Sequence, residues 1–380
     1  MTDACDIVPC FFRVRTNTNY ENILKRNEAA YMKIAKSELF ELMKRKLMKA
    51  GLKEDAAADV SDVLTFADHR GIHSHGAVRV EYYAERIAKG GITTHPEYKF
   101  EKTGPSTAVF EGDNGPGHQA AKQAMDEAIA MAKENGVAVV GVRNISHSGA
   151  LGYFVEMAAE QDMVAISMCQ SDPMVVPFGG TEPYFGTNPI AFSAPSNDHR
   201  IITFDMATTV QAWGKVLDAR AKHLAIPDTW AVNAQGEPTT DSRDVHALVP
   251  VAGPKGYGLM MMVDILSGSL LGLPHGIHVS SMYKDLTKGR DLGQLHIVIN
   301  PAFFTDLDQF KVQISTMLDE LKAQPAAQGY GEIFYPGERG RLRAEKYDAD
   351  GIEIVDDIYN YLVSDDVHYD RYHGKNRFAE

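Results

Sequence analysis

The chain has 380 residues, of which 44% are hydrophobic and 23% charged, and this composition is typical of a folded globular protein rather than a disordered or fibrous one. Its 38 Lys and Arg against 51 Asp and Glu give a formal net charge of −13, which disfavours binding to nucleic acids and to anionic membranes. The three cysteines, Cys5, Cys10 and Cys169, lack metal-ligand spacing and favour a reducing compartment. We therefore expect a cytoplasmic protein with no metal, no nucleic-acid partner and no membrane span.

The beginning of the chain predicts an extension followed by two helices. Residues 1–31 show no sustained apolar periodicity and are expected to form an N-terminal extension. Ser37 is the expected N-cap of a helix that stops at Gly51. A second apolar stripe with helical spacing follows and ends at Gly71.

From residue 107 onward, short apolar strands alternate with helices, and this alternation predicts a mixed α/β fold. A loop is expected at 324–341, where Gly and Pro are frequent. Strands are expected at 107–111, 137–144, 163–169, 189–195, 200–205 and 294–300, and helices at 121–132, 151–161, 255–271 and 305–323.

The segment GIHSHGAVRVEYY at 71–83 is a candidate carboxylate site. Arg79 and Tyr83 follow His75 at i+4 and i+8, so a helix that begins near His75 would carry all three on one stripe. Its N-terminal amides would favour an anion, and Arg79 would hold a carboxylate through two parallel hydrogen bonds. The alternative is structural, with Tyr83 in the core stripe, Arg79 in a surface ion pair, and His73 and His75 as loop residues.

The segment NISHSGALGYF at 144–154 predicts a strand-to-helix turn that carries His147. An imidazole titrates near neutral pH and is therefore suited to accept a proton from an alcohol. The ends of buried strands are also where α/β proteins gather catalytic side chains. The alternative is that His147 is a helix cap or a hydrogen-bonded structural residue.

The segment GPGHQA at 115–120 formally satisfies the dinucleotide fingerprint G-x-G-x-x-G/A. However, Pro116 has no amide to donate, and no acidic residue ends a strand about 20 residues later. We expect a tight turn here, not a Rossmann phosphate site. The loops at 171–192 and 204–209 are rich in Gly, Pro, Asp and Thr and have the groups to contact a ribose or an amide, although many loops without ligands look the same.

Six segments, in this order, resemble the second, non-Rossmann type of the malate/L-lactate dehydrogenase family: DHRGIHSHGAVR, GHQAAKQAM, RNISHSGALGYF, VPFGGTEPYFGTNPIAF, FDMATT and GPKGYGL. The resemblance runs from about residue 32 to the C-terminus. It implies a homodimer with a non-Rossmann NAD-binding domain at 106–274, built on a large mixed or antiparallel sheet. It also implies a helical region for substrate binding and dimerisation, formed by 32–105 and 275–380.

The activity implied by the resemblance is the NAD-dependent oxidation of a 2-hydroxy acid. Within the family, segments such as AVRVEYYAERI and SMCQSDPMVVPFGG favour (S)-ureidoglycolate as substrate and oxalurate as product, a step of allantoin degradation. The alternatives within this class are malate, lactate, sulfolactate and diketogulonate. From a different class, the chain could be a catalytically silent scaffold that keeps the fold.

The resemblance also implies roles for individual residues. His147 matches the proton acceptor, with His75 as the alternative base. Arg79 is expected to bind the substrate carboxylate, with Ser74 and Tyr83 beside it. The positions that match cofactor contacts are Ser171, Asp172, Asp205, Met206, Ala207, Lys255, Gly337, Glu338 and Arg339.

Overall fold

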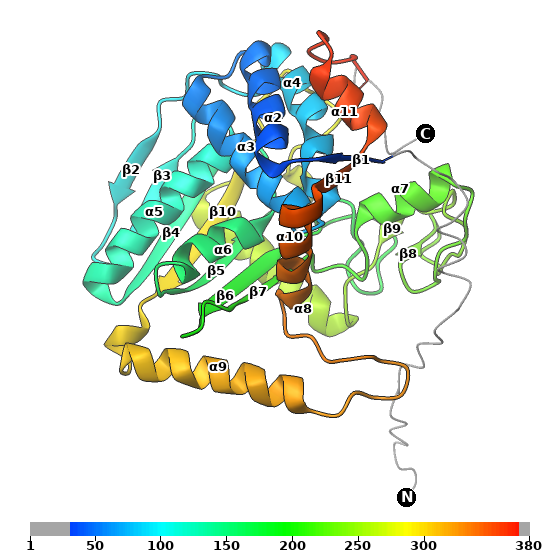
Figure 1. Ribbon diagram of the computed structural model, residues 1–380. Coiled ribbons are helices and arrows are strands. Elements are labelled where there is room, and N and C mark those ends of the chain that lie inside the picture. Colours follow the sequence, from blue (N-terminus) through cyan, green and yellow to red (C-terminus); the bar gives the residue numbers. More distant parts are fainter. Residues whose placement is uncertain (1–30, 372–380) are drawn as a thin grey trace, which may run out of the picture.

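The computed structural model describes residues 31–371, so the extension expected at 1–31 lies, except for its last residue, outside the described residues (Figure 1). A seven-stranded sheet forms the centre of the molecule, and the prediction of a mixed α/β fold is confirmed. All neighbouring strands in this sheet are antiparallel except β3 and β4, which are parallel, so the sheet is not of the Rossmann type. The strands lie in the order β2 (Lys99–Lys102), β3 (Thr107–Glu111), β4 (Val137–Ile145), β10 (Leu292–Ile299), β5 (Val164–Cys169), β6 (Ile190–Pro195) and β7 (Ile201–Met206).

Strand β10 lies between β4 and β5, although it follows β5 by more than 120 residues in the chain. Both β2 and β10 lie within the ranges 32–105 and 275–380, for which we expected a helical region, and both are strands of the central sheet. The physical reason is that the side chains of β10 are buried or half-buried on both faces, so the strand suits a position between two others with both faces of the sheet covered.

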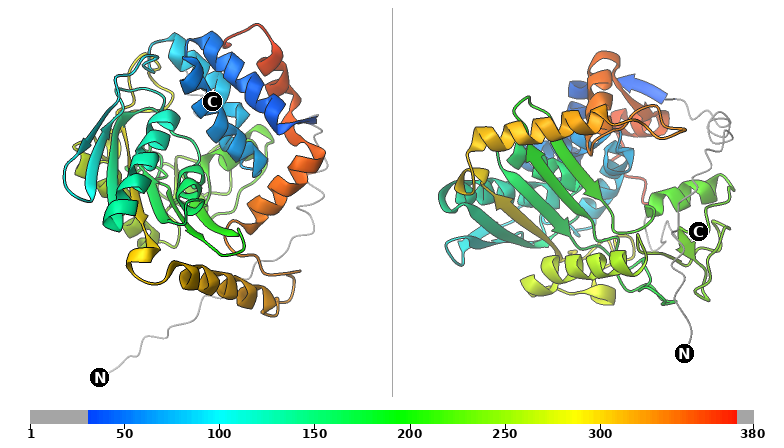
Figure 2. Two further views of the ribbon diagram at one scale, coloured as in Figure 1. Left: turned by 60° about the vertical axis from the view of Figure 1, so that its left-hand side comes forward. Right: turned by 90° about the horizontal axis from the view of Figure 1, so that it is seen from below.

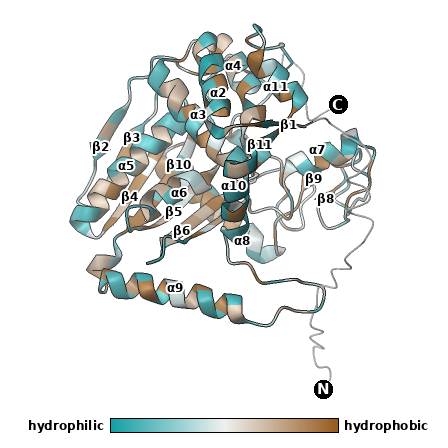
Figure 3. Ribbon diagram, in the orientation of Figure 1, coloured by the Kyte–Doolittle hydropathy of each residue, from teal (hydrophilic) through white to brown (hydrophobic). Residues whose placement is uncertain are grey.

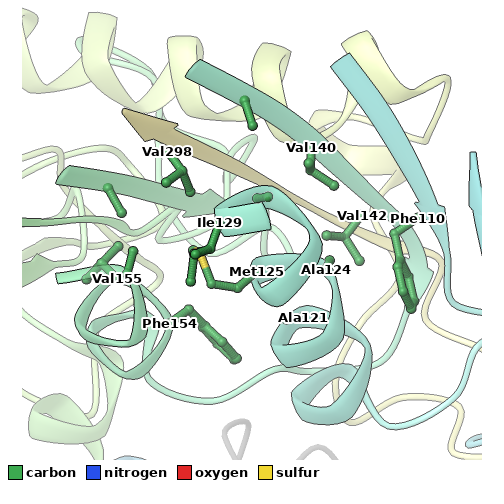
Figure 4. Close-up of a cluster of buried hydrophobic side chains, with 14 of the residues drawn as sticks. Phe110, Ala121, Ala124, Met125, Ile129, Val140, Val142, Phe154, Val155 and Val298 are labelled. Atoms are coloured by element: carbon green, nitrogen blue, oxygen red, sulfur yellow. The ribbon is translucent and has the colours of Figure 1, made fainter. Parts of the chain in front are cut away.

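Helices cover both faces of the sheet. On one face, α5 (Gly117–Asn135) and α6 (Leu151–Ala159) pack against the strands through a cluster of buried hydrophobic side chains, part of which is shown in Figure 4. Successive strand side chains point to opposite faces, so Val298 contacts these helices while Ile297 faces the other side. There, α8 (Pro254–Ser267) covers the sheet through Val263. Figure 2 shows α8 and α9 (Leu307–Ala323) on opposite sides of the strands.

A second core joins the two ends of the described chain. Leu39 and Leu64 share one buried cluster with Ile352 and Tyr361, so the N-terminal and C-terminal helices form one layer. Strands β1 (Tyr31–Ile34) and β11 (Ile352–Val355) pair antiparallel beside it. The helices of this layer are α2 (Lys36–Ala50), α3 (Glu54–His69), α4 (Val80–Ala88), α10 (Glu338–Asp350) and α11 (Asp356–Val363).

The remaining elements are short or peripheral. A small lobe beside the sheet holds α7 (Trp213–Ala221), β8 (Ala231–Val232) and β9 (Ala247–Leu248). Single 3₁₀ turns lie at η1 (His73–His75), η2 (Ala77–Arg79), η3 (Ser269–Leu271), η4 (Gly276–His278) and η5 (Pro301–Phe303). Among residues 31–371, no helix combines the length and apolarity needed to cross a bilayer.

Three local expectations are wrong. Helix α2 begins at Lys36 with Ala35 as its N-cap, so Ser37 lies inside the first turn. Helix α10 begins at Glu338, inside the expected loop at 324–341, because this mostly hydrophilic helix (Figure 3) lacks the apolar stripe that would predict it. No single helix carries His75, Arg79 and Tyr83, since two 3₁₀ turns precede α4.

The start of α5 touches the turn after β4 so closely that only glycine fits. A Cβ atom on Gly117 would lie 2.1 Å from the carbonyl oxygen of Ser146. We expect Gly117→Ala to lower the free energy of unfolding by about 1 to 3 kcal/mol, measured by chemical denaturation. The matched control is Gly214→Ala in α7, where a Cβ also meets nothing within 4 Å, and a gain of up to about 1 kcal/mol is expected. Equal effects of the two substitutions would contradict the close packing at Gly117.

Candidate active site

A buried carboxylate holds the loop that carries the predicted substrate residues. Asp68, at 2% exposure, bonds through Oδ1 to His73 Nδ1 at 2.9 Å and accepts from the Ala77 amide at 2.7 Å. Burial raises the pKa of the Asp68 carboxyl, while these two hydrogen bonds act to lower it. A Cβ on Gly76 would lie 2.1 Å from this carboxylate, so the loop can close only on glycine. Asp68 therefore fixes the backbone between the two 3₁₀ turns that present His75 and Arg79.

Arg79 is oriented by two neighbours and does not point freely into solvent. Its Nε donates to the main-chain carbonyl of Ser74 at 2.7 Å, and its Nη1 donates to the Tyr283 hydroxyl at 2.9 Å. Ser74 is exposed, and its hydroxyl lies 3.0 Å from His75 Nδ1. Sequence reasoning missed Tyr283, because it lies about 200 residues further along in a segment without periodicity. The guanidinium is thus held in place before any carboxylate binds it.

The turn from β4 to α6 places His147 next to Tyr83, as the sequence predicted for the turn itself. The Tyr83 hydroxyl is 2.7 Å from His147 Nδ1, and the Gly149 amide donates to the same nitrogen at 3.3 Å. On either side of His147, Ser146 accepts from the Gly117 amide and Ser148 donates to Gln294 of β10. This hydrogen-bonded frame fixes the position of the imidazole.

Three histidine rings gather around Tyr83. The rings of His75 and His147 stack with centroids 5.9 Å apart, and His118 lies 6.2 Å from His147 and edge-on to Tyr83 at 5.0 Å. Burial lowers the pKa of His75 and of His118 to about 3 each, with a smaller contribution from Arg79 at His75. Burial, followed by Arg79, also holds the pKa of His147 well below its ordinary range. All three imidazoles are therefore neutral at pH 7.

His118 was missed as a site residue. It follows Gly117 in the segment at 115–120 that resembles the dinucleotide fingerprint, for which we predicted only a tight turn. Its Nε2 is fully buried and has no hydrogen-bond partner among the described residues. The signal that could have identified it is a polar residue at the start of a helix whose buried side chains are otherwise mostly apolar.

Several predicted cofactor positions border the His147 turn. Asp205, at the end of β7, accepts from the Gly152 amide at 2.8 Å in the first turn of α6. The Ser171 hydroxyl lies 3.1 Å from that of Thr187, whose carbonyl accepts from the Thr208 amide at 2.9 Å. These contacts bring the ends of β5 and β7 to one edge of the sheet, with Met206 and Ala207 between Asp205 and Thr208.

Lys255 joins this group through the segment that precedes α8. The Val251 amide donates to the Thr208 carbonyl at 2.9 Å, and Lys255 follows four residues later, exposed in the first turn of α8. On another side, Gly337 approaches β7 so closely that a Cβ would lie 2.9 Å from the Thr203 amide nitrogen. Arg339 is exposed and its guanidinium lies 4.4 Å from the centre of the Phe334 ring.

Two of the predicted cofactor residues use their carboxylates inside the protein. Glu338 is buried, accepts from the Tyr335 amide at 3.2 Å and pairs with Lys322 at 3.0 Å. Asp172 is buried and accepts from the Met282 amide at 3.0 Å and from Arg290 at 3.3 Å. Cofactor contacts at these two positions are therefore better suited to the backbone than to the side chains.

The groups that remain fit a dinucleotide. Lys255 and Arg339 are exposed cations, each in the first turn of a helix of 13 or 14 residues, where amides and the helix dipole favour a phosphate. Hydroxyl and carboxylate oxygens at Ser171 and Asp205 have the chemistry to contact a ribose. These groups therefore have the chemistry that a dinucleotide requires, with a cation at the start of each of two helices and oxygen atoms suited to a ribose.

One cluster of potential metal ligands occurs among the described residues. Glu85, His368 and Asp370 have ligand atoms within 4.8 Å of one another. However, Lys89 Nζ lies 2.7 Å from Glu85 and also pairs with Asp370, so a cation of the protein already neutralises these acids. The expected absence of a metal stays a prediction.

The low pKa values of the clustered histidines predict an unusual titration. We expect the ring signals of His75 and His118, whose pKa values lie at about 3, to stay constant in NMR spectra between pH 8 and pH 5, and the ring of His147 to titrate below the ordinary pKa of a histidine, which is near 6.5. In the unfolded chain the same rings take up protons near 6.5, so their contribution to stability is present above that pH and is lost as the pH falls below it. Titration of any of these three rings near 6.5 would contradict the assigned burial.

Comparisons with known proteins agree with the fold and with the order of the motifs. A sequence model described as malate/L-lactate dehydrogenase matches residues 34–363. Ureidoglycolate dehydrogenase (NAD(+)) of Escherichia coli strain K12 is 58% identical over 349 residues, which cover 92% of this chain and 100% of that protein. Malate dehydrogenase of Pyrococcus abyssi is 40% identical, over 87% of this chain and 93% of that protein. Sulfolactate dehydrogenase from Methanocaldococcus jannaschii has a similar structure, with a TM-score of 0.82 at 38% identity, covering 87% of this chain and 95% of that one. The chain therefore belongs to the malate/L-lactate dehydrogenase family.

Proposed function

We propose that this protein oxidises (S)-ureidoglycolate to oxalurate by transferring a hydride to NAD. The observation that carries the proposal is the 58% identity, over the full length of the relative, to the ureidoglycolate dehydrogenase (NAD(+)) of Escherichia coli. In the reaction the C2–H bond of the substrate breaks with transfer of its electron pair, the hydroxyl proton leaves to a base, and a C2=O bond forms. The reaction needs a carboxylate clamp, a base and a site for the hydride acceptor.

Arg79 is our proposed carboxylate clamp, with Ser74 and Tyr83 completing the substrate site. Its guanidinium is already oriented by Ser74 and Tyr283, so little side-chain entropy remains to be lost on binding. A planar guanidinium also matches the two oxygens of a carboxylate. A carboxylate held by Arg79 would bring the C2 hydroxyl toward the stacked histidines.

We assign the base to the stacked pair, with His147 as proton acceptor and His75 as the alternative. A proton can be accepted at His147 Nε2 only when Nδ1 carries the hydrogen and donates to Tyr83. The Gly149 amide can only donate, so it favours the opposite tautomer in the free enzyme. The Tyr83 hydroxyl can donate or accept, so it supports both tautomers. Tyr83 is thus suited to let His147 change its tautomer when substrate binds.

NAD, when bound, supplies the hydride acceptor. We assign its contacts to Ser171, Lys255, the start of α10 and the end of β7, with Asp172 and Glu338 contributing through the backbone. Lys255 and Arg339 would hold phosphates, and Ser171 and Asp205 would face ribose groups. The rings of Tyr83 and His118 beside His147 are buried and would limit the access of water to the reacting atoms.

We further propose a cytoplasmic homodimer. The exposed apolar side chains of α8, including Met261 and Ile265 one turn apart, support an interface, because neighbouring exposed apolar side chains favour the association of two protein surfaces. The small number of cysteines, of which Cys169 is unpaired in the structure, supports a reducing compartment.

A second candidate is the oxidation of another 2-hydroxy acid. Malate dehydrogenase of Pyrococcus abyssi and the sulfolactate dehydrogenase of Methanocaldococcus jannaschii support it at 40% and 39% sequence identity. Arg79 alone would not distinguish these substrates, because all of them share the carboxylate that it binds. The silent scaffold is disfavoured, since the site keeps the arginine and the histidines that catalysis needs.

The substrate is tested by comparing acids at equal concentration. We expect NAD to be reduced with a kcat/KM at least about 10²-fold higher for ureidoglycolate than for malate, lactate or sulfolactate, followed by nicotinamide absorbance. Preference for another acid would overturn the proposed substrate and keep the reaction class. Absence of turnover, with no thermal stabilisation by NAD, would favour the scaffold.

The clamp is tested by Arg79→Ala. We expect KM to rise by about 10- to 100-fold, because a charge-assisted hydrogen bond to the substrate is lost, while kcat changes less. Arg79→Lys is the matched control and should recover part of the affinity, since it keeps the charge without the planar pair of donors. An unchanged KM in Arg79→Ala would exclude this role.

The base is tested by comparing His147→Ala with His75→Ala. Loss of a general base lowers turnover by about 10²-fold or more, so we expect that loss in kcat for His147→Ala and a smaller one for His75→Ala. Steady-state kinetics with the preferred acid provide the measurement. The reverse ranking would transfer the role of base to His75.

A further inference from the structure

Arg290 lies at the same edge of the sheet as the proposed catalytic groups. In the antiparallel pair of β10 and β4, Leu292 is opposite Ile145. Arg290 precedes Leu292 by two residues and His147 follows Ile145 by two residues, so both continue beyond the same end of this pair. Directly opposed residues in such a pair have Cα atoms about 5 Å apart. The register of β10 therefore places Arg290 beside the His147 turn.

The same edge also receives Asp172 from β5. Gln294 of β10 is opposite Cys169, and the Gln170 amide continues the pairing by donating to the Gly293 carbonyl at 3.3 Å. Asp172 follows two residues later and accepts from Arg290 at 3.3 Å. Arg290 thus sits between the ends of β4 and β5, where the predicted substrate and cofactor residues meet.

The hydrogen bonds of Arg290 leave one end of its guanidinium open. Nε donates to the Ser280 hydroxyl at 3.1 Å, and Nη2 donates to the Ser280 carbonyl at 2.7 Å as well as to Asp172. Nη1 has no hydrogen-bond partner among the described residues, yet it is not one of the fully sealed polar atoms. The residue as a whole is only 2% exposed. A buried, permanently charged donor with an accessible, unpaired N–H group is costly unless a ligand completes it.

A second guanidinium of the same segment shows the contrast. Arg86 is 1% exposed and its Nε, Nη1 and Nη2 donate to the carbonyls of Gly91, Met282 and Lys288, respectively. Arg86 therefore ties down the segment around Tyr283 with every nitrogen used. Arg290 also holds this segment in place, but only through Nε and Nη2, which donate to Ser280 and Asp172.

We propose that Arg290 Nη1 recognises an acceptor oxygen on the substituent at C2 of the substrate, at the end away from the carboxylate held by Arg79. This inference rests on the proposed 2-hydroxy acid oxidation and deepens it. The ureido carbonyl of ureidoglycolate supplies such an oxygen, and so does a second carboxylate or a sulfonate. The methyl group of lactate supplies none and leaves the guanidinium unpaired. Arg290 thus selects 2-hydroxy acids that carry a second acceptor group.

The wild-type enzyme provides the first test. We expect kcat/KM for ureidoglycolate to exceed that for lactate by at least about 10²-fold, because sites built to hydrogen-bond a substrate reject analogues that lack the partner. A smaller ratio would overturn the inference. A preference for malate or sulfolactate with lactate still poor would refute ureidoglycolate as the substrate while supporting the role of Arg290.

The second test compares Arg290→Lys with Arg86→Lys. Both substitutions loosen the same segment, but only the first removes the open donor. We expect Arg290→Lys to reduce the selectivity for the preferred acid over lactate by at least about tenfold, and Arg86→Lys to leave that ratio as in the wild type. An equal loss for both acids, or the same change of ratio in both variants, would reduce Arg290 to a structural role. If Arg290→Lys does not fold, as judged by thermal unfolding, the wild-type ratio decides.

Discussion

The insertion of β10 between β4 and β5 is the constraint on which the rest of the structure depends. Strand β10 joins the strands β2, β3 and β4 on one side to β5, β6 and β7 on the other, and it comes from a later part of the chain than all of them. The Ser148 hydroxyl donates to Gln294 of β10, whose amide donates to Ser167 of β5, so a buried polar chain joins the turn after β4 to both strands. Because β10 starts just after Arg290, the same insertion brings Arg290 beside the His147 turn, and Tyr283 of the preceding segment contacts Arg79.

Charge at the proposed site is opposite to the charge of the protein as a whole. The chain carries a net charge of −13, yet burial lowers the pKa of His147 most, and the cations Arg79 and Arg290 act in the same direction. Burial keeps the three histidines neutral, so the positive charge near His147 comes from the arginines. In the proposed function, an anionic acid would meet the guanidinium of Arg79, that of Arg290 beside its partner Asp172, and uncharged rings, a balance suited to binding a carboxylate and to accepting the proton of the hydroxyl.

Sequence reasoning found the elements whose chemistry is local. The strand at 107–111, the helix stop at Gly136 and the turn that carries His147 occur where periodicity and glycine predicted them. Asp68, His118, Tyr283 and Arg290 were missed, because an acid on a helix, a histidine at a helix start and an arginine before a strand look like ordinary surface residues until their burial is known. The single helix expected from His75 failed for a related reason, since the contact of Asp68 with Gly76 and Ala77 breaks it into 3₁₀ turns.

The sequence by itself determined the family, the mixed α/β class and the identity of Arg79, Tyr83 and His147 as a group worth testing, because these follow from motif order, period and side-chain chemistry. Only the tertiary structure decided which strand fills the centre of the sheet, which carboxylates are already engaged and which guanidinium keeps an open donor. Strand order and burial depend on contacts between segments far apart in the chain, and no local pattern of residues encodes the distance between them.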